Sequence, residues 1–264
     1  MNAHLVVTVA LVGLASPAAA QTLATRIAQA PDGDVRVAFS AREGVSGNGR
    51  NVIQWGCDRG RCRQQSEGNF SDDVDWHTPC DSGPVRLALW VRGGRVVSLH
   101  AYVGGQWVPR QGVTDLGRVP APEAGRYLLG LARQGGGEVG ERAVFAATLA
   151  DSVTAWPELL RLARDEAVPD RTRRSAVFWV SQAAEEAATR GLDSLVGEDT
   201  VDREVREQAV FALSQRPREE GVPALIRIAK THSDPEIRRR AIFWLGQSHD
   251  PRALALFEDL LTKP

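Results

Sequence analysis

Apolar positions in residues 121–264 recur at the spacing of amphipathic helices, and the pattern itself repeats along the chain. An Ala-Val-Phe or Ala-Ile-Phe tripeptide returns four times, at intervals of 33, 33 and 32 residues, beginning at Ala143, Ala176, Ala209 and Ala241. A repeat of this length is typical of helix pairs. Each pair leaves an apolar face that only the next pair can cover, so the units are expected to stack.

The last unit shows why the tripeptide marks a helix. From Ile237 onward, apolar residues stand at positions i, i+4, i+7 and i+8, which is one stripe of a helix. The preceding Asp234, Pro235 and Glu236 supply an N-cap, a proline at the first helical position and an acidic residue in the first turn. We expect Asp202 to cap the equivalent helix one unit earlier.

A second set of helices alternates with the first. The pattern predicts these helices at Arg126–Arg133, Pro157–Arg164, Leu192–Val196, Pro223–Lys230 and Ala253–Leu261. Residues 121–264 are therefore predicted to form an α-solenoid of about four repeats plus a capping half-repeat.

Residues 21–120 show the alternation of β-strands instead. Between Pro84 and Trp107, two alternating runs joined by Gly93-Gly94 predict a hairpin whose first strand turns Val85, Leu87, Leu89 and Val91 to one face. Further strands are expected at Val35–Ala41 and Asn51–Cys57, a loop at Glu43–Arg50, and a short helix or strand at Ala24–Ala30. The predicted fold class is α+β, with a small antiparallel β-sheet domain followed by an all-α solenoid.

Residues 1–20 resemble a secretory signal peptide. An apolar run from Leu5 to Leu14 leads to Ser16-Pro17 and an Ala-x-Ala site that ends at Ala20. The run is too short to span a bilayer comfortably. A buried N-terminal helix is the alternative, but it would end without a cap. We therefore predict cleavage after Ala20, a periplasmic or secreted protein, and no membrane insertion after cleavage.

Export changes the interpretation of the three cysteines, because thiols tend to pair in an oxidising compartment. Cys57 and Cys62 flank four residues that could close a hairpin and hold the two thiols opposite each other. Cys80 is the alternative partner of either. A metal site is the weaker interpretation, since the spacing is C-x4-C and no second Cys/His pair has finger-like spacing.

The net charge and the motifs of the sequence argue against several classes of partner and enzyme, but they do not assign a function. The net charge is −1, and residues 21–120 and 121–264 are both close to balance, so charge does not favour a nucleic-acid or anionic-membrane partner. Hydrolase, zinc-protease, phosphate-loop and dinucleotide fingerprints are missing from the sequence. We therefore expect no enzymatic activity and no cofactor.

Two stretches of residues 21–120 carry groups that could do chemistry. Asp72, Asp73, Asp75 and His77 could ligate a hard cation, but the glycine and distal glutamate of an EF-hand loop are missing, so a solvated acidic loop is expected. His100 lies in the middle of a predicted strand, where packing is the expected role.

The repeat carries a family resemblance. A capping Asp followed by x-x-Val/Ile-Arg-x-x-Ala-x-x-Ala/Trp-Leu resembles HEAT repeats, in particular the short type shared with phycobilisome-lyase-like proteins. The resemblance covers roughly residues 123–264 and implies a right-handed α-solenoid whose usual role is to bind proteins. It does not imply lyase chemistry, because the match is to the repeat architecture. The layout of the whole chain resembles that of exported bacterial HEAT-repeat proteins.

Three ladders of repeated side chains are the candidate sites. The Phe ladder (Phe145, Phe178, Phe211, Phe243) and the Gln ladder (Gln182, Gln215, Gln247) point away from the apolar stripe. They could line the concave face and contact a partner, or the Phe side chains could be core between repeats. Arg173, Arg206 and Arg238 repeat at one offset. In HEAT-like arrays such arginines commonly pair with a capping Asp of a neighbouring unit, and a ligand-facing basic stripe is the alternative.

The function predicted from the sequence is a non-catalytic protein-binding or scaffolding protein of the cell envelope. Its solenoid surface would hold a protein or peptide partner. The alternative is a periplasmic enzyme or metal-binding protein with its site in the loop around Cys57–Cys80.

Overall fold

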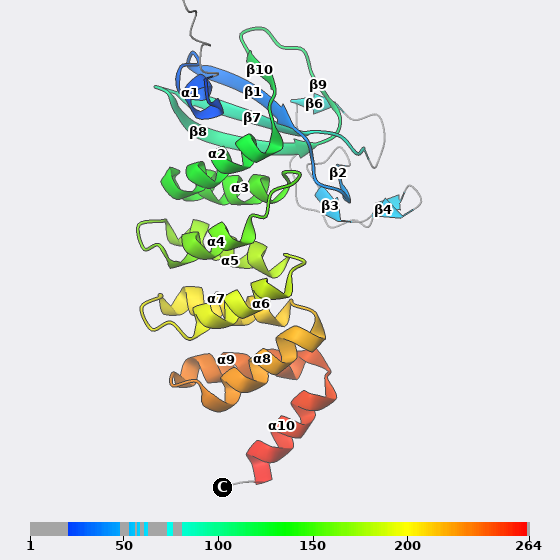
Figure 1. Ribbon diagram of the computed structural model, residues 1–264, viewed down its shortest axis with the longest axis vertical. Coiled ribbons are helices and arrows are strands. Elements are labelled where there is room, and N and C mark those ends of the chain that lie inside the picture. Colours follow the sequence, from blue (N-terminus) through cyan, green and yellow to red (C-terminus); the bar gives the residue numbers. More distant parts are fainter. Residues whose placement is uncertain are drawn as a thin grey trace, which may run out of the picture.

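A computed structural model of the chain places a β-sheet at one end of a stack of helices (Figure 1). It describes residues 21–47, 73–75 and 81–262, together with the backbone of 53–55, 57–58 and 61–62. Helices follow one another in layers from the sheet to the C-terminal end, in the order of the sequence (Figure 1). Within the described residues, no helix is long and apolar enough to span a bilayer.

The main sheet has four strands, in the order β10-β1-β7-β8. They are β1 (Gly33–Phe39), β7 (Val85–Arg92), β8 (Arg95–Val103) and β10 (Thr114–Arg118). The β1–β7 and β7–β8 pairs are antiparallel, as the alternation predicts, but β10 pairs parallel to β1. The sheet is therefore mixed, and the predicted all-antiparallel sheet is wrong at this edge. The parallel strand brings the chain back beside β1, where Val119 donates a backbone hydrogen bond to Ala38 (2.8 Å), immediately before the first solenoid helix.

The predicted hairpin is confirmed in its two strands and its turn. β7 and β8 pair around Gly93 and Gly94, whose φ angles of +56° and +71° are those of a primed two-residue turn. The four alternating side chains of β7 that were expected on one face, Val85 to Val91, are buried. A side chain at either glycine would be strained in this left-handed backbone, which explains the Gly-Gly sequence.

Short elements surround this sheet. Three pairs of small strands are β2 (Val45–Gly47) with β3 (Ile53–Trp55), β4 (Cys57–Asp58) with β5 (Arg61–Cys62), and β6 (Val74–Asp75) with β9 (Gln106–Trp107). The expected loop at Glu43–Arg50 is therefore partly wrong, because its middle pairs as β2. The segment expected as a helix or strand at Ala24–Ala30 is the helix α1 (Leu23–Ala28), whose N-cap is Thr22.

The solenoid consists of four helix pairs and a ninth helix within the described residues. The pairs are α2 (Ala121–Gln134) with α3 (Gly137–Thr148), α4 (Trp156–Arg164) with α5 (Asp170–Ser181), α6 (Glu186–Val196) with α7 (Arg203–Ser214), and α8 (Arg218–Thr231) with α9 (Pro235–Ser248), followed by α10 (Pro251–Thr262). We call the four pairs units 1 to 4. Second helices pack on second helices along the stack, and first helices pack on first helices.

The predicted helices are present, but some of them begin at an earlier residue than the sequence pattern indicates. Helix α6 begins at Glu186 rather than Leu192, and α8 begins at Arg218, so Pro223 lies inside it rather than at its start. Proline lacks the N–H that would bond to the carbonyl of Glu219. Because both residues are exposed, water can satisfy that carbonyl and the helix continues.

The sheet and the solenoid share one hydrophobic core. Buried side chains of β1, β7 and β8 belong to the same cluster as those of the helices. Helix α3 packs on β8, where Arg142 donates a hydrogen bond to the carbonyl of Leu99 (3.0 Å) and contacts His100 Nε2 (2.8 Å). Backbone bonds from Arg42 to Leu149 (2.9 Å) and from Asp151 to Ser40 (3.0 Å) add to this junction.

The junction should respond to pH through His100. Burial, followed by the neighbouring Arg142, lowers the pKa of His100 from its ordinary value of 6.5. The unfolded chain then binds the proton more readily, so the free energy of unfolding falls as pH drops through about 6.5 and levels off below the folded pKa. We expect His100→Gln to weaken this loss, measured as the change in Tm between neutral and mildly acidic buffer. An unchanged pH dependence in the variant would contradict this assignment.

Candidate functional site

Aromatic side chains of the second helices meet between units. Trp179 lies against Phe145 of the preceding unit, with ring centroids 4.9 Å apart, and edge-on to Phe178 at 5.2 Å. Trp244 repeats this arrangement with Phe211 at 4.9 Å and Phe243 at 5.0 Å. The Phe ladder is thus divided into two equivalent clusters of three aromatic rings, each spanning two units.

The Phe ladder is neither fully exposed on the surface nor fully buried as core between repeats, which were the two alternatives considered from the sequence. Phe145, Phe178 and Phe211 are half-buried, and Phe243 is 53% exposed. The stacking explains the partial burial, because Phe145 and Phe211 each lie beneath a Trp of the next unit. The ladder is therefore partly packing and partly surface.

The tryptophans were missed as candidate residues, although they follow the ladder Phe directly. In units 1 to 4 the residue after that Phe is Ala146, Trp179, Ala212 and Trp244. Small and large side chains thus alternate, which gives the array a second period of two units. The signal was present in the sequence, but its meaning depends on which side chains meet across units.

Two pockets lie where each Trp borders the next loop. The first pocket, of about 120 Å³, is lined by residues that include Thr148, Trp156, Leu159, Trp179 and Gln182. The second pocket, of about 250 Å³, is lined by residues that include Ser214, Gln215, Leu225, Trp244 and Gln247. On the other side of Trp244, a wider hollow of about 450 Å³ is bordered by Phe211, Gln208 and charged side chains. All three residues of the Gln ladder therefore line a pocket.

The Gln side chains are exposed and partly oriented by the helix ends. Gln182 Nε2 donates to Ser181 Oγ (3.0 Å), and Gln215 Nε2 donates to Ser214 Oγ (3.1 Å). Each serine hydroxyl in turn donates to the carbonyl of the Phe three residues before it, at 2.6 and 2.7 Å. An amide held this way keeps one N–H and an acceptor oxygen, which is the complement of a peptide group.

Two arginines of the Arg ladder, Arg173 and Arg206, contact the aspartate that precedes the next second helix. Buried Arg173 donates to Asp170 (2.6 Å) and to Asp202 of unit 3. Asp202 stands at the N-cap of α7, but its side chain makes no cap hydrogen bond, so the predicted capping role is wrong; Arg173 holds the carboxylate instead.

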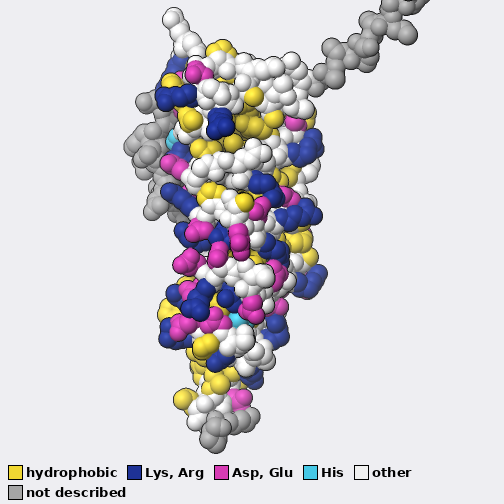
Figure 2. Space-filling model, turned by 90° about the vertical axis from the view of Figure 1, so that its left-hand side faces the viewer, with side chains coloured by type: hydrophobic (Ala, Val, Ile, Leu, Met, Phe, Trp, Pro, Cys, Tyr) yellow, Lys and Arg dark blue, Asp and Glu magenta, His cyan; other side chains and the backbone are white. Residues whose placement is uncertain are grey.

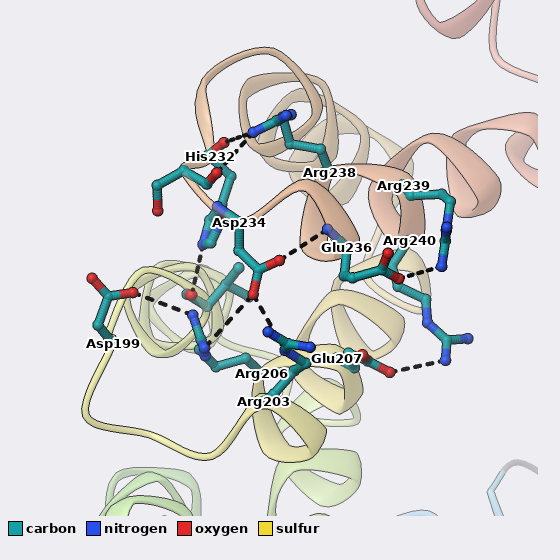
Figure 3. Close-up of polar contacts among 12 residues, drawn as sticks. Asp199, Arg203, Arg206, Glu207, His232, Asp234, Glu236, Arg238, Arg239 and Arg240 are labelled. Carbon is teal, nitrogen blue, oxygen red and sulfur yellow. Dashed lines mark hydrogen bonds and ion pairs between the residues drawn. The ribbon is translucent and has the colours of Figure 1, made fainter.

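The next arginine of the Arg ladder, Arg206, lies beside Asp234 (Figure 3). Arg206 pairs with Asp199 (3.3 Å) and lies 3.9 Å from Asp234, which caps α9 by accepting from the Glu236 N–H at 2.9 Å. This backbone hydrogen bond, and after it Arg203 and Arg206, lowers the pKa of Asp234. Arg238 instead donates to the carbonyls of His232 (2.6 Å) and Ser233 (2.9 Å).

Charged side chains elsewhere on the array also pair between units. Examples are Arg133–Glu158, Arg164–Glu198 and Arg240–Glu207, at 2.7 to 3.0 Å. Basic and acidic side chains accordingly lie side by side along the face shown in Figure 2. Each exposed pair contributes only about 0–1 kcal/mol, so their main consequence is that much of the arginine charge is compensated locally.

The β-strand pairing brings two of the three cysteines together at the backbone. Cys57 and Cys62 are directly opposed in the β4–β5 hairpin. Opposed residues of an antiparallel pair have Cα atoms about 4.5–5.5 Å apart, within the range of about 4.4–6.8 Å that a disulfide spans. The side chains of both residues, and all of Cys80, lie outside the described part of the chain, so the disulfide stays a prediction.

The acidic stretch is described only in part. Asp73 accepts from the Tyr102 hydroxyl (3.0 Å) and from Arg110 (3.0 Å), and Asp75 lies in β6. Asp72 and His77 lie outside the described residues. Among the residues that the structure does describe, no group of three or more His, Cys, Asp or Glu side chains could hold a metal ion.

Comparison with known proteins supports the architecture. The family model for HEAT repeats matches residues 198–264, which span α7 to α10. None of the curated proteins compared with the sequence matches it. The matched segment continues the same helix-pair register that runs from α2 onward. Residues 198–264 therefore match HEAT repeats, and they lie at the end of an array of four stacked helix pairs.

Proposed function

We propose that this protein is a non-catalytic adaptor of the cell envelope, which holds a protein or peptide partner on the second helices of its solenoid. HEAT repeats commonly mediate protein–protein interaction. The observation that supports the proposal most directly is the surface formed by the two aromatic clusters and the Gln ladder, which we call the aromatic–glutamine surface.

The chemistry of this surface suits a polypeptide. Aromatic rings supply rigid apolar contact area at low conformational cost, and they are enriched among the side chains that dominate binding energy. Exposed Gln amides can donate to and accept from a peptide backbone. Much of the nearby charge is compensated within the array, so recognition would depend on apolar burial and hydrogen bonding.

Phe243→Asp should abolish most of the partner binding. Phe243 is the most exposed ring of the Phe ladder, and an aspartate there would remove the ring and place in the interface a charge that binding must desolvate. We expect the amount of partner recovered by crosslinking and pull-down from the cell envelope to fall at least about tenfold, the loss that corresponds to about 1.4 kcal/mol.

The matched control is Leu261→Asp, which introduces the same charge at an 87% exposed position of α10. This variant should recover the partner as the parent chain does. Equal recovery by both variants, with unchanged helix content, would contradict the proposed surface.

Envelope location is part of the same proposal. If residues 1–20 are removed on export, N-terminal sequencing of the protein recovered from the envelope fraction should begin at Gln21. Full-length protein confined to the cytoplasm would contradict the location while leaving the binding surface to be tested there.

The alternative of an enzyme or metal-binding protein, with its site around Cys57–Cys80, makes a different prediction. Stoichiometric metal in the purified protein, measured together with a free-thiol count, would favour that alternative over an adaptor.

A further inference from the structure

We propose that the two Trp-walled pockets bind one extended peptide through two apolar side chains six positions apart. This inference rests on the proposed function and adds to it the form of the ligand. It is derived from the equivalence of the pockets, their separation along the array and the polar groups at each.

The two pockets are built from equivalent positions two units apart. Thr148, Trp179 and Gln182 of the first pocket correspond to Ser214, Trp244 and Gln247 of the second. Leu159 on a first helix corresponds in the same way to Leu225. The same type of pocket therefore occurs twice. Each is lined by a hydroxyl group, an indole ring, a glutamine amide and a leucine side chain.

The unit between them is different. Unit 3 carries Ala212 where its neighbours carry Trp179 and Trp244, and Ala212 is fully buried. It offers no indole wall beside Phe178, but it does contribute Gln215. A peptide that crosses this unit would meet an amide between two apolar anchor sites.

The stacking of the helices sets the spacing of the anchors. Packed helices lie about 8–10 Å apart, so α5 and α9, two steps apart, are separated by roughly 16–20 Å. An extended chain advances about 3.3 Å per residue, and alternate side chains point to the same side. Six residues cover about 20 Å and leave both anchors on one side, whereas five would turn the second anchor away.

The groups at the pockets define the anchors further. The first pocket, about 120 Å³, has room for an aliphatic side chain; the second, about 250 Å³, has room for an aromatic one. At the first pocket, Trp156 forms part of the wall, and its Nε1 is buried without a hydrogen-bond partner among the described residues. At the second, exposed Arg218 acts on Asp250 through its charge but forms no side-chain hydrogen bond or ion pair within the described chain, so its guanidinium N–H groups can bind a carboxylate beside the aromatic anchor.

Selection from a displayed library of random peptides against the full-length chain tests this. We expect the enriched peptides to carry an aliphatic and an aromatic residue six positions apart, with an acidic residue next to the aromatic one. For a synthetic peptide of this type, Trp179→Ala and Trp244→Ala should each weaken binding at least tenfold by fluorescence anisotropy. The control, Trp90→Ala, removes an exposed indole from the sheet and should leave binding unchanged.

A change in the peptide provides a test that does not depend on variant folding. Inserting one residue between the anchors should weaken binding to the parent chain at least tenfold, because it turns one anchor to the opposite side. If peptides are enriched but a single anchor suffices, or the insertion has no effect, the two-pocket inference is overturned and the proposed binding function stands. Failure to enrich any peptide, with no partner lost on Phe243→Asp, would overturn both.

Discussion

Replacing Arg216 by methionine should lower the free energy of unfolding by about 3–5 kcal/mol, the cost of removing one partner from a buried charged network. Its side chain is 2% exposed. Methionine keeps much of the volume of the arginine stem but makes none of its hydrogen bonds, so the loss would report the polar contacts rather than a cavity.

Arg216 joins the end of one second helix to the next unit. Its guanidinium donates to the carbonyl of Ser181 (3.1 Å), the last residue of α5, and to those of Ala183 and Glu185 (3.0 Å), which follow the helix. Carbonyls at a helix end have no hydrogen-bond donor within the helix and carry negative partial charge. A buried guanidinium there donates hydrogen bonds to these carbonyls and offsets their partial charge.

The same side chain organises two polar groups at the edge of the site. Nε donates to Thr189 Oγ1 (2.7 Å), and Nη2 donates to Glu220 (2.9 Å). The hydrogen bond from Thr189, and after it that from Arg216, lowers the pKa of Glu220. In the methionine variant this carboxylate would keep Thr189 but lose its second donor, and the three carbonyls would lose the guanidinium.

Arg190→Met is the matched control, because Arg190 is exposed, forms an ion pair with Glu186 one turn away on α6, and acts on Glu220 only through its charge, without a hydrogen bond among the described residues. It should change the free energy of unfolding by less than about 1 kcal/mol. Stacked repeats can unfold in parts, so urea melts should be read together with hydrogen exchange of α5 to α8. Equal stability of the two variants would contradict the role of Arg216.

Gly221→Ala should destabilise the protein, although this substitution normally stabilises a helix by about 1 kcal/mol. Gly221 lies within α8, and a Cβ atom there would lie 2.2 Å from the carbonyl oxygen of Leu213 on α7. The contact is with backbone, which cannot rotate away as a side chain can. We expect a loss of at least about 1–3 kcal/mol, the usual range for overpacking.

Gly130→Ala is the control substitution, for which we expect the free energy of unfolding to change in the opposite direction. Gly130 lies within α2, and a Cβ atom there would have no neighbouring atom within 4 Å. This control should therefore raise the free energy of unfolding by about 0.5–1 kcal/mol. Shifts of Tm in opposite directions would confirm that Gly221 is required for the approach of α7 and α8, and a stabilising Gly221→Ala would show that the two helices can separate at little cost.

The elements that were predicted well are those whose signals are local. The hairpin around Gly93-Gly94 follows from strand alternation and from the need for positive φ at the turn. Strand β10 could not be found in this way, because its pairing partner β1 lies far away in the sequence. The start of α6 was also missed, since apolar spacing marks the buried face of a helix and says little about its exposed first turn.

The candidate site was predicted in outline. The positions of the Gln ladder came from the repeat register, and the structure places all three amides on the surface beside pockets. Arg216 was not anticipated, because it interrupts the repeat: the equivalent positions are Ala150 in unit 1, Ala183 in unit 2 and Ser248 in unit 4. A residue that occurs once in a repeated pattern carries no periodic signal.

By itself, the sequence determined the register of the solenoid: which residues are equivalent, how many helices the described part of residues 121–264 forms, and which stripe of each is apolar. These properties depend on helical periodicity and on caps within a few residues. Tertiary structure decided the roles of Trp179, Trp244 and Arg216, since each acts on a group in the neighbouring unit, about one repeat away in the chain. Whether a large side chain becomes a pocket wall or a clamp depends on the residue it meets in the next layer, and only packing of the layers brings the two together.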